Sequence, residues 1–290
     1  MGAMLSSAAP MRSVFVTGGN SGIGLALCKQ LAAEDGCYVY MGSRSMERGL
    51  AALKEISAGI EDKIEVVQCD ISDPTSVKAA AETVKEKLSS PLYALVNNAG
   101  VGLAHGVSAD EINNTNVYGT MSMVDAFLPL LQPEGGRIVS VGSGAGPMWL
   151  AKQDDETKAL LTSGKLSSTE AIDGYMKAVR NADAGHAYGL SKCILSVYTE
   201  YLAKAYPKII SSSITPGFID TKITAGFGAS KSPEEGTVSI RHCLFKELEG
   251  NGFFYGSDAV RSPFYPSRSP GTAPFTGSYP WSPGMMSSSL

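Results

Sequence analysis

Tyr188 and Lys192 lie four residues apart in the segment YGLSK, and no other tyrosine in the chain has a lysine at this spacing. In an α-helix this spacing places two side chains on one face, one turn apart. The ordinary pKa of tyrosine is about 10, too high for easy proton exchange at neutral pH, and a neighbouring cation stabilises the phenolate. The pair therefore predicts a proton donor, Tyr188, whose pKa Lys192 lowers.

A serine follows the apolar run GRIVSV, and it is the second group that such chemistry requires. A ketone or aldehyde that accepts a hydride develops negative charge on its oxygen, so a proton donor and a hydrogen-bond donor must both point at that atom. We predict that Ser143 donates this hydrogen bond and orients the carbonyl. Ser140, three residues earlier, is the alternative.

Residues 16–26, VTGGNSGIGLA, place four glycines between an apolar run and the start of a helical pattern. Gly18 would permit a tight turn, Gly22 would let a pyrophosphate approach the backbone, and Gly24 would let the helix lie close to the strand. An ordinary glycine turn is the alternative. Because the loop joins a strand to a helix, it predicts a dinucleotide site.

The second predicted strand ends in MGSRSMERG, and its basic residues bear on the choice of cofactor. In dinucleotide folds an acid about 20 residues beyond the glycine loop binds the ribose 2′-hydroxyl of NAD, whereas a basic residue accommodates the 2′-phosphate of NADP. A guanidinium makes paired, charge-assisted bonds to phosphate. Arg44, with Ser43 and Arg48 beside it, therefore favours NADP. The alternative is a solvated loop arginine.

Strand and helix patterns alternate along the chain, which predicts a parallel sheet with crossover helices in one doubly wound α/β domain, residues 13–256. Residues 1–12 read as a flexible N-terminus. The predicted strands lie in SVFVTG, CYVYMG, KIEVVQC, LYALVNN, GRIVSVGS, KIISSSITPG and GFFYG. After residue 257 the chain becomes rich in Pro, Ser and Gly, so residues 257–290 are predicted to be an irregular tail. Its aromatic residues leave open whether it packs on the domain: Phe264, Tyr265, Phe275, Tyr279 and Trp281.

Composition narrows the classes of partner. The 290 residues carry a net charge of −4 and no basic block, which argues against nucleic acid. No apolar run reaches the roughly 20 residues of a membrane span. Five scattered cysteines without metal-ligand spacing fit a reducing cytoplasm and predict no metal site.

Further motifs follow the glycine loop in order: NNAG at 97–100, TNVYGT at 115–120, SVGSGAG at 140–146, YGLSK at 188–192 and PGFIDT at 216–221. With the spacing T-G-x-x-x-G-x-G, this set resembles the short-chain dehydrogenase/reductase family over residues 13 to about 255. The resemblance implies a Rossmann-like fold and these cofactor-binding residues: Gly18, Asn20, Ser21, Gly22, Ile23, Gly24, Arg44, Asp70, Ile71, Asn98, Ala99, Gly100, Tyr188, Lys192, Pro216, Gly217, Ile219 and Thr221.

The same resemblance assigns roles to single residues. Lys192 would also hold the nicotinamide ribose hydroxyls, and Asn116 would bend its helix around a water that relays protons to Lys192. Asp70 would meet the adenine amino group. The alternatives are a helix cap for Asp70 and a helix cap or surface position for Asn116.

An insertion, residues 148–185, separates Ser143 from Tyr188 by more than is usual in this family. Within it, SSTEAIDGYMKAV predicts a helix from Ser168 to Ala182, with a capping box from Ser167 to Glu170 and an apolar stripe of Ile172, Tyr175, Met176 and Val179. This arrangement resembles the monomeric, NADPH-dependent carbonyl-reductase branch. It implies a monomer that reduces a small hydrophobic ketone, aldehyde or quinone.

The interpretation is an NADPH-dependent carbonyl reductase with Asn116, Ser143, Tyr188 and Lys192 as catalytic residues. One alternative is an epimerase or dehydratase on the same scaffold, although those enzymes usually have the loop T-G-x-x-G-x-x-G and a larger C-terminal domain. The other is a dinucleotide sensor without turnover.

Overall fold

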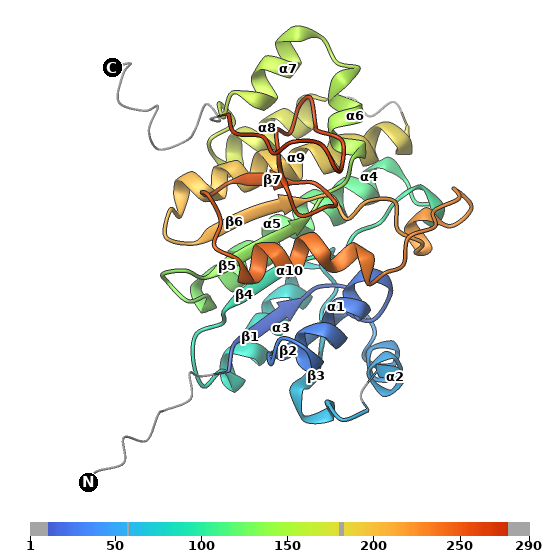
Figure 1. Cartoon of the computed structure of the whole chain (residues 1–290), viewed down its shortest axis with the longest axis vertical. Helices are drawn as coiled ribbons and strands as arrows, with labels where there is room; N and C mark the ends of the chain where they lie inside the picture. Colours follow the sequence, from blue (N-terminus) through green and yellow to red (C-terminus); the bar gives the residue numbers. More distant parts are fainter. Residues whose placement is uncertain (1–10, 57, 180–182, 278–290) are drawn as a thin grey trace.

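The computed structural model describes residues 11–56, 58–179 and 183–277. Within these ranges one sheet has the strand order β3-β2-β1-β4-β5-β6-β7-β8 (Figure 1). Neighbouring strands pair in parallel up to β7, and β8 runs antiparallel to it. The strands are β1 Ser13–Val16, β2 Tyr38–Ser43, β3 Ile64–Gln68, β4 Ala94–Asn97, β5 Arg137–Val141, β6 Ile210–Ile214, β7 Phe253–Tyr255 and β8 Arg261–Ser262.

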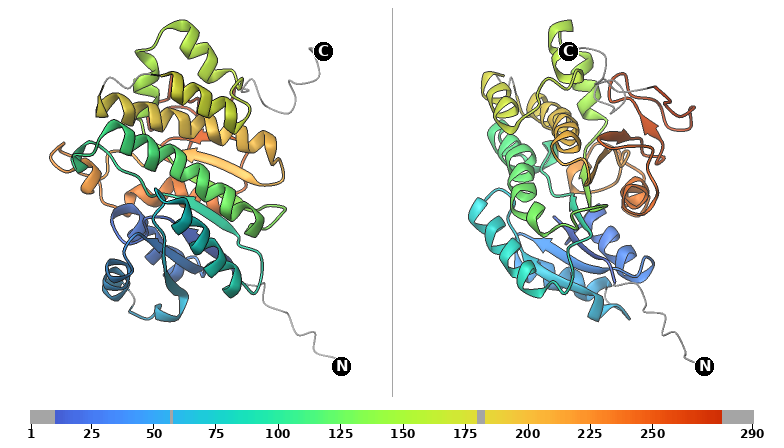
Figure 2. Two further views of the ribbon diagram at one scale, coloured as in Figure 1. Left: turned by 180° about the vertical axis from the view of Figure 1, so that it is seen from behind. Right: turned by 90° about the vertical axis from the view of Figure 1, so that its left-hand side faces the viewer.

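Helices cover both faces of the sheet, as predicted. They are α1 Gly22–Ala33, α2 Met46–Ile56, α3 Pro74–Lys87, α4 Ala109–Asn113, α5 Thr120–Phe127, α6 Ala145–Ala151, α7 Asp155–Thr162, α8 Thr169–Ala178, α9 Ala184–Ala205 and α10 Val238–Phe245. Helices α1 and α10 lie on one face, and α3, α5 and α9 on the other (Figure 2). No helix in the described part of the chain has both the length and the apolar character to cross a bilayer.

The two faces of the sheet arise from the alternation of side chains along each strand. In β1, Val14 and Val16 pack under α1 and α10, whereas Phe15 packs on the opposite face against Phe127 of α5, with 4.5 Å between ring centroids. Nearly all of these strand positions are buried, because helices cover both faces. This explains why the strands read as continuous apolar runs.

The strand order reverses direction between β1 and β4, and ligands of such sheets bind where this reversal opens a crevice. A hydrogen bond from Thr17 N to Val96 O, 3.0 Å, continues the β1–β4 ladder to the ends of both strands. The glycine loop and the NNAG motif therefore start side by side.

The insertion contains the end of α6 and all of α7 and α8, and the predicted capping residue of α8, Ser167, was wrong by one residue. Ser168 is the N-cap, in extended backbone geometry, and its Oγ accepts from Ala171 N at 3.1 Å. Ser167 N donates instead to Lys165 O. The helix ends at Ala178, and residues 180–182 of the predicted helix lie outside the described residues. The apolar stripe is correct, since Ile172 and Met176 are buried.

The described part of the tail packs on the domain, which answers the question that its aromatic residues raised. Phe264 is buried, and its ring lies edge-on to Phe254 of β7 with 5.4 Å between centroids. Strand β8 extends the sheet within an otherwise irregular segment (Figure 1). Tyr279 and Trp281 lie outside the described residues.

Candidate active site

A cavity of about 1680 Å³ lies at the carboxyl ends of the parallel strands. Its lining comes from the loops after β1 to β7, from α6 and α9, and from the tail. Most small-ligand sites have volumes of roughly 300–1,000 Å³. This cavity is larger than such a site requires.

The glycine loop forms one wall of the cavity, and its geometry requires glycine. Gly18 and Gly22 have φ of 62° and 51°, in the left-handed region that side chains disfavour. A Cβ on Gly24 would lie 2.3 Å from Gly18 O and 2.5 Å from Asn98 Nδ2. Gly24 therefore lets α1 start directly against the loop, behind the cavity lining.

Thr17 holds the two neighbouring loops together, and sequence reasoning did not assign it to the site. Its Oγ1 accepts hydrogen bonds from Asn98 N and Ala99 N, both at 2.9 Å, and donates to Val96 O at 3.3 Å. Asn98 Nδ2 returns a bond to Thr17 O at 2.9 Å. The threonine that opens the T-G-x-x-x-G-x-G spacing was the available signal.

Two arginines border one end of the cavity, beyond the glycine loop. Arg44 and Arg48 both line it, together with Ser43 and Ser45. Ser43 Oγ donates to Ser45 O at 2.8 Å, and Ser45 Oγ accepts from Arg48 N at 3.3 Å. These bonds fix the turn that carries both arginines beside the cavity.

Asp70 and Ile71 also border the cavity, after β3. Asp70 Oδ1 accepts from Ser72 N at 3.0 Å and from Ser72 Oγ at 2.6 Å. The N-cap of α3 is Asp73, whose carboxylate accepts from Thr75 N. Asp70 is therefore not the helix cap that sequence analysis kept as its alternative.

Tyr188 and Lys192 lie one turn apart on α9 and both line the cavity. Lys192 is 5% exposed, its Nζ donates to Val141 O at 2.9 Å, and this atom lies 5.8 Å from the centre of the Tyr188 ring. Burial lowers the pKa of Lys192 to about 8, so the amine remains mostly protonated at neutral pH.

The pKa of Tyr188 departs from its ordinary value in the opposite direction to the prediction. Burial of the phenol raises this pKa, and a hydrogen bond with the Ser143 side chain lowers it by less. The proton thus resides on Tyr188 at neutral pH, which suits a donor rather than a base.

Ser143 faces this pair, whereas Ser140 does not border the cavity within the described residues. Ser143 follows β5, lines the cavity and accepts from Ala145 N at 3.1 Å as α6 begins. Ser140 is buried inside β5. The geometry favours Ser143 over its alternative.

Asn116 lies behind the cavity wall, in a π-helical turn, Asn114–Gly119, between α4 and α5. Its Oδ1 accepts from Val101 N at 2.8 Å, and its Nδ2 donates to Ser191 Oγ at 3.1 Å. The N-cap of α4 is Ser108, and Asn116 is 1% exposed, so neither the cap nor the surface alternative describes it. It fixes the loop after β4 to α9 beside Lys192.

Apart from Gly24, every predicted cofactor-binding residue lines the cavity. Those not yet placed are Asn20, Ser21, Ile23, Gly100, Pro216, Gly217, Ile219 and Thr221. These residues therefore surround one continuous space.

Most of the chain is similar in sequence to known proteins. Residues 12–154 match the family described as short chain dehydrogenase. The chain is 34% identical to short-chain dehydrogenase/reductase 1 of Saponaria officinalis, over 88% of this chain and 97% of the relative. The chain belongs to the short-chain dehydrogenase/reductase family.

Members with named activities are similar to this short-chain dehydrogenase/reductase over most of its length. It is 30% identical to carbonyl reductase [NADPH] 1 of Mus musculus, over 80% of this chain and 89% of that one. The solved structure of salutaridine reductase from Papaver somniferum superposes with a TM-score of 0.73 at 26% identity, covering 84% of this chain and 99% of the other. The family resemblance seen in the sequence is thereby confirmed, and the protein is an oxidoreductase of this family.

The end of the cavity beyond Tyr188 contains residues that sequence reasoning missed in this short-chain dehydrogenase/reductase. Met148 and Trp149 of α6 line it, and so do Phe218 and Phe227. Met148, Phe218 and Phe227 are each more than half exposed. The insertion was a signal for the first two, because both lie at its start, residues 148 and 149.

Proposed function

We propose that this protein is an NADPH-dependent reductase of a hydrophobic ketone, aldehyde or quinone. One observation supports this most: Tyr188, Ser143 and Lys192 meet in a cavity that continues to the glycine loop and to two arginines. A proton donor and a hydrogen-bond donor then face the same space as the predicted cofactor cradle.

The lining fits NADP on the chemistry of its groups. Backbone amides of a glycine loop at a helix start suit a pyrophosphate, and the left-handed Gly22 keeps the backbone free of side chain there. Arg44 and Arg48 would hold the 2′-phosphate. Asp70 would meet the adenine, and the segments 98–100 and 216–221 would meet the nicotinamide half. The mouse relative, which is named for NADPH, agrees with this choice.

The chemistry requires one hydride and one proton. Bound NADPH supplies the hydride for the carbonyl carbon. Tyr188 then gives its hydroxyl proton to the carbonyl oxygen, which completes the alcohol, while Ser143 donates a hydrogen bond to the same oxygen. The charge of Lys192 stabilises the phenolate left on Tyr188, and Asn116 keeps α9 in place through Ser191.

The side chains beyond Tyr188 support a hydrophobic substrate. Met148, Trp149, Phe218 and Phe227 offer apolar surface at the open end of the cavity. Exposed apolar groups gathered around a cavity mark a binding surface.

A panel of ketones, aldehydes and quinones, followed by the loss of NADPH absorbance, tests the proposal. Turnover of hydrophobic members with NADPH preferred over NADH is the expected result. Tight NADPH binding without turnover of any member would instead indicate a sensor. Conversion of a sugar nucleotide without net consumption of NADPH would indicate an epimerase or dehydratase.

Carbonyl reduction should decline at alkaline pH with a midpoint near 8. Lys192 has a pKa of about 8 and loses its charge as the pH rises through that value, which removes the cation that stabilises the Tyr188 phenolate. The pH profile of kcat/KM reports groups of the free enzyme. Burial raises the pKa of Tyr188 above its ordinary value, so a midpoint well above that of Lys192 would assign the decline to Tyr188 and contradict the role of Lys192.

We also propose a monomer, because α8 covers apolar surface on the helices that precede β5 and carry Tyr188. Ile172 and Met176 join the core cluster that contains Met121 and Leu190. Tyr118 OH donates to Asp173 Oδ1 at 3.1 Å, which also joins α8 to this surface. Light scattering after gel filtration should give the mass of one chain, 30.4 kDa. A stable dimer or tetramer would show that the insertion leaves the helical face open.

A further inference from the structure

The tail contributes a wall to the cavity that its composition did not predict. Ser267, Arg268, Ser269 and Pro270 line the cavity, and so do Gly256 and Ser257 after β7. Each of Ser267, Ser269 and Pro270 is exposed, as expected of residues that border an open space. Segment 256–273 therefore borders the cavity at its start, residues 256–257, and again at residues 267–270.

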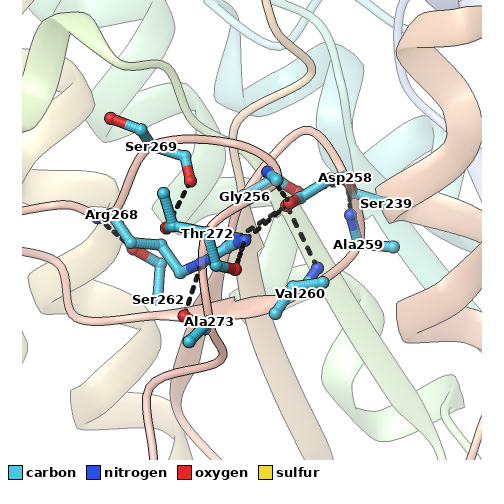
Figure 3. Close-up of polar contacts among 11 residues, drawn as sticks. Ser239, Gly256, Asp258, Ala259, Val260, Ser262, Arg268, Ser269, Thr272 and Ala273 are labelled. Carbon is cyan, nitrogen blue, oxygen red and sulfur yellow. Dashed lines mark hydrogen bonds and ion pairs between the residues drawn. The ribbon is translucent and has the colours of Figure 1, made fainter.

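Arg268 closes this segment into a loop. Its Nη1 and Nη2 donate to the two carboxylate oxygens of Asp258 at 2.8 and 2.7 Å. Nη2 also donates to Thr272 O at 2.6 Å, and Nε to Ala273 O at 3.2 Å (Figure 3). The Arg268 side chain is 7% exposed and that of Asp258 is 24% exposed, so the pair is partly shielded from water. The arginine holds the pKa of the Asp258 carboxyl well below its usual range.

The loop is fastened to helix α10 at its start, and to β8 within the segment itself. Ser239 of α10 donates through Oγ to Gly256 O at 2.6 Å and accepts from Ala259 N at 3.1 Å (Figure 3). Arg268 N donates to Ser262 Oγ of β8 at 2.9 Å. Together these bonds make the loop a fixed wall rather than a free end.

The tail packs on Phe254, a cavity residue close to the turn that carries Ser143. Phe264 of the tail packs on Phe254, which itself lines the cavity. A Cβ on Gly142, next to Ser143, would lie 3.9 Å from the Phe254 ring. The tail is thus connected, through Phe254, to the neighbourhood of Ser143. It also reaches the insertion, since Lys158 of α7 lies 6.0 Å from the centre of the Tyr265 ring.

We propose that segment 256–273 is a specificity-determining wall for the part of the substrate remote from its carbonyl, and that Arg268, paired with Asp258, is the positioning residue that holds it. The inference rests on the proposed reductase function. A short carbonyl compound would occupy the space at Tyr188 and Ser143, whereas a longer one would extend past the side chains nearest to this pair and reach residues 267–270. The wall therefore discriminates by length, through contacts that a short substrate does not make.

The test measures KM for straight-chain aldehydes from propanal to decanal, in the wild type and in Arg268→Met. We expect KM to rise by about tenfold for decanal, the equivalent of roughly two buried methylene groups. KM for propanal and the Kd of NADPH should stay within twofold or so of the wild type, because neither ligand needs the wall. Glu249→Gln is the matched control. It removes the ion pair between Glu249 and Arg261 of the tail, which are 3.2 Å apart. Neither residue lines the cavity.

A second variant, Ser267→Phe, keeps the inference testable if Arg268→Met does not fold. Ser267→Phe leaves the Arg268 pair intact and fills space at the wall, so it should also raise KM for decanal and not for propanal. Equal changes for both aldehydes, no change, or a lower KM for decanal in these variants would overturn the inference. A wild-type protein that oxidises NADPH with none of the aldehydes, ketones or quinones would instead contradict the proposed function itself.

Discussion

Tyr188→Phe should lower kcat for carbonyl reduction by about a thousandfold, within the 10²–10⁴ range typical of general acid catalysis. The variant keeps the ring and removes only the hydroxyl that would protonate the carbonyl oxygen. The Tyr188 ring packs beside Gly102, because a Cβ built on Gly102 would lie 3.2 Å from Cε2 of Tyr188. The phenylalanine ring should therefore keep the position of the tyrosine ring. Steady-state kinetics with NADPH and the best substrate of the panel gives kcat, and NADPH fluorescence titration gives Kd.

A tyrosine hydroxyl far from the cavity supplies the control. Tyr38 OH donates to Glu65 Oε2 at 3.1 Å, between strands β2 and β3. Tyr38→Phe should leave kcat unchanged, and both variants should bind NADPH as the wild type does. Full activity of Tyr188→Phe would remove Tyr188 from the mechanism. Loss of NADPH binding in that variant would show that the hydroxyl holds the cofactor.

Arg44→Asp should weaken NADPH binding by roughly 10- to 100-fold and relatively favour NADH. A charge-assisted hydrogen bond typically contributes about 1.5–3 kcal/mol, and the new carboxylate would also repel the 2′-phosphate. NADH lacks this phosphate, so its affinity should change little. Titration calorimetry with both cofactors measures the two dissociation constants, and their ratio is the specificity.

The net charge of the protein also changes by two units in this variant, and Lys29→Glu controls for that. Lys29 is exposed on α1 and does not line the cavity. It should leave the ratio of the two dissociation constants unchanged. Unaltered NADPH affinity in Arg44→Asp would mean that Arg44 is the solvated loop arginine of the alternative interpretation, and Arg48 would then be the residue to replace.

The sequence by itself determined the α/β class, the strands β1 to β7 and the motif residues that follow the carboxyl ends of these strands. Each of these depends on local spacing. Apolar runs bounded by glycine predict buried strands, positions 188 and 192 share a face in any α-helix, and parallel strands bring their carboxyl ends to one edge of the sheet. The Gly18 turn follows equally from local rules, since its φ of 62° is open to glycine.

Tertiary structure decided the points that depend on contacts between distant segments. Ser143 and Ser140 are three residues apart in one strand-end run, and only the position of α9 shows which of them faces Tyr188. Burial by surrounding segments set the pKa directions of Tyr188 and Lys192, against the direction that their spacing predicted for the tyrosine. The tail packs on the domain through Phe264 on Phe254 of β7, and the Asp258–Arg268 pair closes its loop; Pro- and Ser-rich composition encodes neither contact. Local spacing specifies elements, whereas burial and long-range pairing specify which side chains meet.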